Sequence, residues 1–161
     1  MTKILLSLHV LAAIIAIGPV TVAASMFPPA ARRAVVPVPA GAGGGTDAGD
    51  VGTVRLLHRI CRVYAGLGIA VPVLGFATAA AMGVLGDAWL ITSIALTAAA
   101  AGLLIAFVLP RQEELLEQLT DRQPVERART ARLAMFTGLF NLLWATVTVL
   151  MIVRPGSTTG A

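Results

Sequence analysis

Few side chains within the apolar parts of this sequence can take part in chemistry. His9 is the only ionisable side chain well inside a long apolar run, and ionisable groups at such positions are functional candidates by default. An imidazole there can contact a cofactor or quinone, relay a proton, or stay neutral and form a packing hydrogen bond. His58, the other histidine, lies near the opposite surface of a ~30 Å hydrocarbon core, so the two cannot ligate one iron. We therefore treat His9 as the cofactor-binding candidate and expect it at the depth of Thr92, Ser93 and Thr148.

Asn141 is the most polar side chain of the last apolar run. Pro72 and Pro19 are expected at nearly the same depth, and each leaves the carbonyl one turn earlier without its helical donor. We hypothesise that the Asn141 amide donates to such a carbonyl, with Gly68 preferred over Ile15; a ligand or quinone contact is the alternative. Interhelical polar contacts are accordingly predicted for six residues, which are His9, Ser93, Thr97, Thr137, Asn141 and Thr148.

A cluster of basic side chains precedes the second apolar run and consists of Arg55, His58, Arg59 and Arg62. We expect these side chains at headgroup level, where they hold anionic lipid or dock an acidic loop of a partner protein. Most of the other basic residues lie in connections between apolar runs, and basic connections face the cytoplasm in membrane proteins. The net charge of +4 therefore indicates membrane orientation, not nucleic-acid binding.

Several kinds of catalytic and transport site have no counterpart in the sequence. The apolar runs contain no Asp or Glu, so a proton-coupled transporter driven by a membrane carboxylate is not predicted. Nothing matches a phosphate-binding loop, a metal cluster or a nucleophile with its base. Cys61 is the single cysteine, so neither an intrachain disulfide nor a cysteine metal cluster is expected. The residues predict no catalytic group, no metal site and no resident cofactor, and hence not an enzyme.

Membrane-spanning helices must position these side chains. The chain is 57% hydrophobic and 12% charged, with a mean hydropathy of +0.87, whereas soluble domains average about 25% charged residues. Four runs without Asp, Glu, Lys or Arg are each long enough to cross a bilayer, and they cover residues 4–27, 63–85, 88–109 and 133–153. The sequence therefore predicts an all-α fold, a four-helix transmembrane bundle that forms a single membrane domain over residues 1–161.

Two longer connections are expected on the cytoplasmic side. Pro28-Pro29 is expected to end the first helix, and residues 28–54 to form a Pro/Gly-rich linker. Residues 110–129 are expected to form an amphipathic cytoplasmic segment. Because the basic connections lie inside, both termini are predicted outside the cell, in a multi-pass protein of the plasma (inner) membrane.

The first helix has two faces, and small residues allow the close approach that membrane helices need. The face expected to pack in the bundle carries His9, Ala12, Ala16, Val20 and Ala23. The face expected to meet lipid carries Leu8, Leu11, Ile15 and Val22.

The sequence resembles a bacterial family of small four-helix integral membrane proteins of unknown function. The resemblance rests on KILLSLHVLAA and Gly18-Pro19 in the first helix, LHRICRVYAGLG opening the second, MGVLGDAWL at the outer hairpin and ITSIALTAAAAGLLIAFVLPRQEELLEQL after it. Within that family the chain is similar to the actinobacterial respiratory supercomplex association factors, which accompany the cytochrome bcc–cytochrome oxidase assembly. This resemblance implies a non-catalytic accessory subunit that lies against larger redox subunits. Whether quinone or lipid lies at the interface is left open by the sequence.

A second resemblance, to the four-helix protoporphyrinogen oxidases of bacteria, implies a haem- or porphyrin-handling membrane enzyme that uses His9. It rests on Leu8-His9, Arg32, Arg62-Val63-Tyr64 and Arg154-Pro155. The first helix lacks that family's tryptophan, Pro28-Pro29 is not followed directly by arginine, and the last basic residue is an arginine where the family has lysine. We therefore expect the accessory subunit and keep the enzyme as the alternative.

Overall fold

The computed structural model describes residues 2–34 and 46–156, and every regular element in this part of the chain is helical. The elements are α1 (Thr2–Arg33), α2 (Thr46–Leu67), α3 (Ala70–Met82), α4 (Ala88–Leu103), the π-helical turn η1 (Leu104–Val108), α5 (Leu109–Thr120) and α6 (Arg127–Val153). Four stretches of the described residues are long and apolar enough to cross a membrane, and they are Thr2–Arg33, Val51–Met82, Ala88–Thr120 and Arg127–Val153. The prediction of an all-α four-helix bundle is confirmed.

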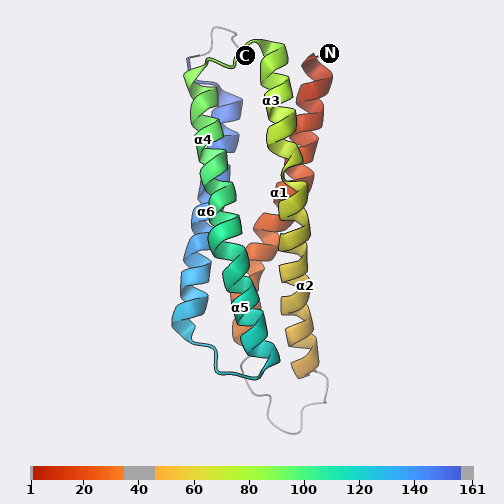
Figure 1. The fold of residues 1–161 in the computed structure, drawn as a ribbon, viewed down its shortest axis with the longest axis vertical. Coiled ribbons are helices and arrows are strands. Elements are labelled where there is room, and N and C mark those ends of the chain that lie inside the picture. Colours follow the sequence, from red (N-terminus) through yellow and green to blue (C-terminus); the bar gives the residue numbers. More distant parts are fainter. Residues whose placement is uncertain (1, 35–45, 157–161) are drawn as a thin grey trace.

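The long helices run side by side, and α2 continues into α3 as α4 continues into α5 (Figure 1). The start of α1, the α3–α4 turn and the end of α6 lie at one end of the bundle. The end of α1, the start of α2 and the α5–α6 connection lie at the other end, which we call the basic end because it carries Arg32, Arg33, Arg122 and Arg127.

Helix α1 continues through Pro28 and Pro29 to Arg33, so the predicted helix end at this pair is wrong. Pro28 and Pro29 leave the carbonyls of Ala24 and Ser25, one turn earlier, without helical donors, so the helix continues here at a local cost in backbone hydrogen bonds. Buried Phe27 and Ala31 hold this part of α1 in the core. The linker predicted over 28–54 is likewise helical at both ends, since α2 begins at Thr46; residues 35–45 lie outside the described residues.

The second membrane stretch is two helices and not one. Gly68 and Ile69 form a turn between α2 and α3. Pro72 has no N–H to offer the Gly68 carbonyl, which accepts instead from the Val71 N–H at 3.1 Å. Helix α3 ends before Gly83, whose φ of 70° is a left-handed conformation that glycine adopts at little cost.

The third stretch is helical over its full length but changes pitch once. The π-helical turn η1 ends at Val108, two residues before Pro110, which occupies the first turn of α5. Such turns accommodate an extra residue in an α-helix. Helix α5 is amphipathic and buries Gln112, Leu115 and Leu119 on one face. The predicted segment over 110–129 is therefore helical as far as Thr120 and again from Arg127, where α6 begins, and residues 121–126 connect the two helices.

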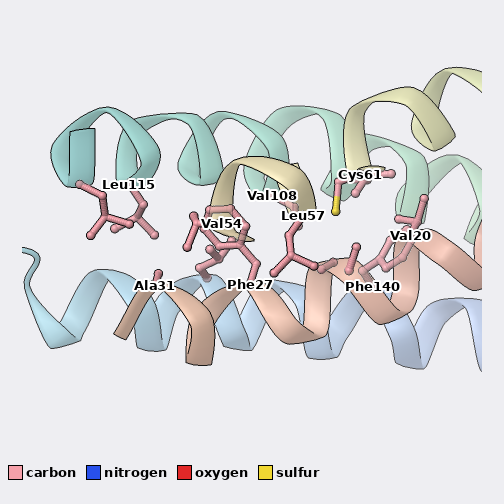
Figure 2. Close-up of a cluster of buried hydrophobic side chains, with 14 of the residues drawn as sticks. Val20, Phe27, Ala31, Val54, Leu57, Cys61, Val108, Leu115 and Phe140 are labelled. Carbon is pink, nitrogen blue, oxygen red and sulfur yellow. The ribbon is translucent and has the colours of Figure 1, made fainter. Parts of the chain in front are cut away.

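Helix α1 is central to the packing, because it contacts α2, α3 and α6, while α4 packs along α6 and α2 along α5. The main core fills the half of the bundle toward the basic end, where Phe27 and Phe140 are fully buried (Figure 2). Leu133 belongs to the same core and is also fully buried. In the other half, α3 has little contact with α4 or α6. A small cluster around Trp89 and Leu90 joins α3 to α4 near their turn.

Candidate functional site

The polar side chains of the described helices form separate contacts at different depths, not one constellation. His9 lies in the half away from the basic end, Asn141 lies between α1 and α6, and His58 lies between α2 and α5. The chemistry available at each contact depends on which of its polar atoms remain free.

His9 of α1 is buried against α3. Its Nδ1 donates to the carbonyl oxygen of Val71 at 3.0 Å, which places the proton of the neutral ring on Nδ1 and leaves Nε2 as an acceptor. Gly75 allows this approach, because a Cβ built there would lie 3.0 Å from the Cε1 of His9. The expected neighbours Thr92, Ser93 and Thr148 are not its hydrogen-bond partners. His9 therefore links α1 to α3, with Nε2 as the atom available to a cofactor.

Three hydroxyls predicted to bridge helices bond within their own helix instead. The hydroxyls of Ser93, Thr97 and Thr148 donate to carbonyls four residues earlier, at 2.8, 2.7 and 2.9 Å respectively. The predicted interhelical contacts of these residues are wrong. The physical reason is proximity, since a Ser or Thr hydroxyl in a helix always has the carbonyl of the preceding turn within reach.

Asn141 links α6 to α1 through a partner that differs from the hypothesis. Its Nδ2 donates to the Oγ of Ser25 at 3.0 Å, whereas the carbonyl of Gly68 bonds to the N–H of Val71. The hypothesis of a bond to Gly68 is therefore wrong. Helix α6 packs against α1 and α4, away from α2 and α3, so the amide cannot reach the carbonyl that Pro72 frees.

A groove runs between α1 and α6 near Asn141, and we call it the α1–α6 groove. Two hydrogen bonds bracket it: Asn141 to Ser25, and, toward the basic end, the Nε of Arg32 to the Oγ1 of Thr130 at 3.1 Å. Its volume is about 230 Å³, and it is lined by Ser25, Pro28, Pro29, Arg32, Ala134, Thr137, Gly138 and Asn141. Thr137 makes no hydrogen bond through its hydroxyl within the described residues, so its predicted interhelical contact is absent.

His58 does not lie with the arginines that flank it in sequence. It is buried between α2 and α5, where its Nδ1 donates to the Oε1 of Gln112 at 3.3 Å. The Nε2 of Gln112 donates in turn to the Sγ of Cys61 at 3.6 Å. Arg55, Arg59 and Arg62 are exposed on the outer side of α2. The predicted headgroup role of His58 is therefore wrong, because helical spacing turns position 58 toward α5.

Gln112 and Ser25 are the partners that sequence reasoning missed. Gln112 is fully buried, and its spacing to Leu115 and Leu119 places all three on one helical face. That spacing was a usable signal that Gln112 belongs to the buried face of α5. Ser25 carries no such signal, since a serine in an apolar helix usually bonds the preceding turn.

The end away from the basic end carries a small polar cluster. The Nε1 of Trp89 donates to the Oδ2 of Asp87 at 2.9 Å, and the guanidinium carbon of Arg154 lies 5.8 Å from the Trp89 ring centroid. An indole held between a carboxylate and a guanidinium suits the water–membrane boundary, where one side of the ring is apolar and the other polar.

These contacts offer hydrogen-bond donors and acceptors at helix interfaces. The described residues hold no group of three or more His, Cys, Asp or Glu that could bind a metal ion. The free groups among these contacts include the Nε2 of His9 and the unpartnered atoms of Thr137 and Asn141 in the α1–α6 groove. Buried atoms of Arg111, Gln118 and Trp144 are also unpartnered among the described residues. Comparison of the chain with protein-family models, curated proteins and solved structures gives no match.

Proposed function

We propose that this protein is a non-catalytic accessory subunit of a larger membrane complex, and that the complex is a respiratory cytochrome bcc–cytochrome oxidase supercomplex. In this proposal the chain is a multi-pass protein of the plasma membrane with its basic end at the cytoplasm and both termini outside. The orientation is supported by the charge bias, since ten of the twelve Lys and Arg lie between the first and second apolar runs or between the third and fourth.

The outward face of α4 is the observation that best supports a partner protein. Ala95, Ala98, Ala99 and Gly102 are all exposed on this helix, and they form two pairs of small residues four apart. Such pairs let a second membrane helix approach closely, and they are typical of helix–helix contacts in membranes. A face that meets only lipid has no need of this pattern.

The outward face of α1 provides the contrast within the same molecule. It exposes large aliphatic side chains, which are Ile4, Leu8, Leu11, Ile14, Ile15 and Val22, as suits contact with acyl chains. Ala16 and Ala23, which the sequence predicts to face the bundle, are buried in it. Alanines thus mark protein contact on this side of α1, and by the same reasoning we assign the small exposed face of α4 to contact with a partner helix.

The identity of the host complex rests on the sequence resemblance to respiratory supercomplex association factors. The apolar surface of the bundle also fits a subunit held among larger membrane proteins. In the most apolar 18 residues of each membrane-spanning stretch, at most 22% of the residues are buried inside the molecule. Anionic lipids at the exposed arginines of α2, and lipid or quinone between the subunits, complete the proposed surroundings.

Affinity purification of a tagged copy from its native membranes in mild detergent tests the proposal. We expect haem-containing bcc and oxidase subunits to co-purify, and Gly102→Leu to remove most of them, because the new side chain fills the small face. The position of Gly102 has open space around it, so the bundle itself should fold.

Gly18→Leu is the matched control, since Gly18 is also an exposed glycine with open space around it, on the lipid-facing side of α1. This variant should retain the partner subunits. Loss of the partners in both variants, or in neither, would contradict docking through α4. A Soret band carried by the purified subunit alone and removed by His9→Ala would instead favour the porphyrin-handling enzyme.

A further inference from the structure

The α1–α6 groove contains polar groups that no protein atom satisfies. Thr137 is 3% exposed, it lines the groove, and its hydroxyl has no hydrogen-bond partner in the described part of the chain. The Oδ1 of Asn141, at the deeper end, is also buried and unpartnered there. Unsatisfied polar groups are costly where no water replaces the missing partner, so the groove favours a ligand with hydrogen-bonding atoms.

The free groups in the groove can all act as donors. The Thr137 hydroxyl donates or accepts. Rotating the Asn141 amide by 180° lets the Ser25 hydroxyl donate to Oδ1 and frees the Nδ2 group to donate into the groove. The guanidinium of Arg32 uses its Nε on Thr130, and its other nitrogens carry further N–H donors. A ligand that fits must therefore offer several acceptors along one edge.

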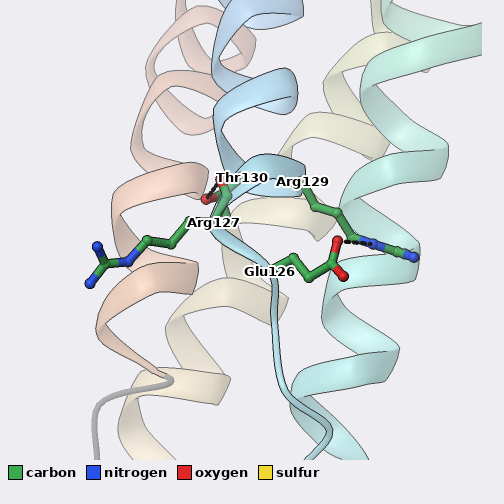
Figure 3. Close-up of polar contacts among 4 residues, drawn as sticks. All are labelled: Glu126, Arg127, Arg129 and Thr130. Carbon is green, nitrogen blue, oxygen red and sulfur yellow. Dashed lines mark hydrogen bonds and ion pairs between the residues drawn. The ribbon is translucent and has the colours of Figure 1, made fainter.

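The charge at the mouth of the groove selects an anion. Arg32 lines the mouth, and Arg33 and Arg127 belong to the adjoining helix ends. Among the described residues the ion pair joins Glu126 to Arg129 at 3.8 Å, and Arg127 points away from both (Figure 3). Among the side chains of residues 2–34 and 51–156, no carboxylate forms an ion pair with Arg32, so Arg32 supplies positive charge at the mouth.

We propose that the α1–α6 groove binds one anionic phospholipid of the leaflet at the basic end. The phosphate contacts the guanidinium of Arg32, and the ester carbonyls accept from Thr137 and Asn141. One acyl chain lies over Ala134 and Gly138, which leave space because they are small. A phospholipid presents acceptors in this order, a phosphate at the surface followed by ester carbonyls deeper in the membrane.

The depth of the residues agrees with this order. Thr137 follows Thr130, the partner of Arg32, by seven residues, which is about 10 Å along a helix of 1.5 Å rise per residue. Asn141 lies one further turn into the membrane. The groove therefore runs from the charged boundary into the apolar layer, as a bound lipid does. This site is separate from the exposed arginines of α2.

Native mass spectrometry of the purified full chain with dioleoyl phosphatidylglycerol as the probe tests the proposal. We expect one tightly bound lipid, with dioleoyl phosphatidylcholine binding more weakly. Arg32→Gln, which keeps a donor for Thr130, should weaken phosphatidylglycerol binding about fivefold, the effect of one basic residue on an anionic lipid. Thr137→Val should weaken both lipids to the same extent, because it removes a contact to the ester.

Gly138→Leu provides the steric test. Gly138 has open space around it, so the variant should fold, but its side chain fills the groove and should abolish the single tight site. Gly102→Leu on α4 is the control and should leave the bound lipid in place. Because Gly102→Leu disrupts partner docking and Gly138→Leu disrupts lipid binding, the failure of one proposal is distinguishable from the failure of the other.

Three results would overturn the proposal. The first is retention of the tight phosphatidylglycerol in Gly138→Leu. The second is competition by inorganic phosphate alone, which would show a simple anion site. The third is an isoprenoid quinone that co-purifies with the protein and is lost in Gly138→Leu, which would assign the groove to a quinone.

Discussion

Single atoms decide how closely α1 approaches α3. Gly75 leaves room for the His9 ring, and the carbonyl oxygen of Val71 accepts the hydrogen bond from its Nδ1. The sequence identifies His9 as an unusual residue. It does not reveal that Gly75, far along the chain, leaves the space that the His9 ring occupies. Spacing along one helix predicts a face, whereas contacts between helices depend on how the helices rotate against each other.

Replacing Gly75 with leucine is expected to destabilise the bundle. The added side chain must displace the His9 ring, and overpacking of this kind costs about 1–3 kcal/mol. We expect a lower midpoint of thermal unfolding in detergent. Gly66→Leu is the control, because open space surrounds Gly66. Its midpoint of thermal unfolding should be close to that of the unmodified protein. Equal stability of the two variants would show that His9 does not pack as described.

The buried Gln112 offers a second test at this scale. Gln112→Leu removes the acceptor for His58 and the donor for Cys61, and leaving the buried imidazole N–H unpaired costs about 1–3 kcal/mol. Gln118 lies on the same helix with a buried, unpartnered Oε1, so Gln118→Leu should be neutral or stabilising. The midpoints of thermal unfolding in detergent compare the two variants. A larger drop in the midpoint for Gln118→Leu than for Gln112→Leu would contradict the hydrogen bonds assigned to Gln112.

At the scale of the elements, the apolar runs are predictable and their ends are not. Charge-free stretches of bilayer length predict the number of helices, because a charge inside the apolar layer is costly. Pro28-Pro29 looks like a helix end but lies inside α1, since tertiary packing around Phe27 overrides a local preference. The α2–α3 break also escapes prediction, because glycine and proline are frequent in unbroken membrane helices.

Because η1 is a π-helical turn, deleting a residue inside it should be tolerated better than deleting a residue of the neighbouring α-helix. Removing Ile105, an exposed residue of η1, should convert the turn to α-helix and keep the buried faces of α4 and α5 aligned, because the turn holds one extra residue. Removing Ala98 from the middle of α4 should rotate the preceding part of α4 by about 100° and misfold the protein. The size-exclusion profiles of fluorescent fusions report how much of each deletion variant elutes as a single folded peak. A larger folded peak for the Ala98 deletion than for the Ile105 deletion would contradict this account.

At the scale of the whole molecule, the described structure places the start of α1 and the end of α6 at the same end of the bundle (Figure 1). The proposed orientation puts this end outside the cell. Alkaline phosphatase fused after Gly156 should therefore be active, and green fluorescent protein fused there dark. Fusions after Arg122, in the α5–α6 connection, should show the opposite pattern. Fluorescence from the Gly156 fusion would invert the orientation and move the groove to the other leaflet.

The measurement that tests the central claim most directly is the size of the particle in which the native protein resides. Membranes solubilised in a mild detergent are separated on a blue-native gel, which is stained for haem and probed for this chain. We predict that the chain migrates with a haem-stained band far larger than its own 16.6 kDa. Migration of all the protein at its own mass would contradict the claim that it is an accessory subunit.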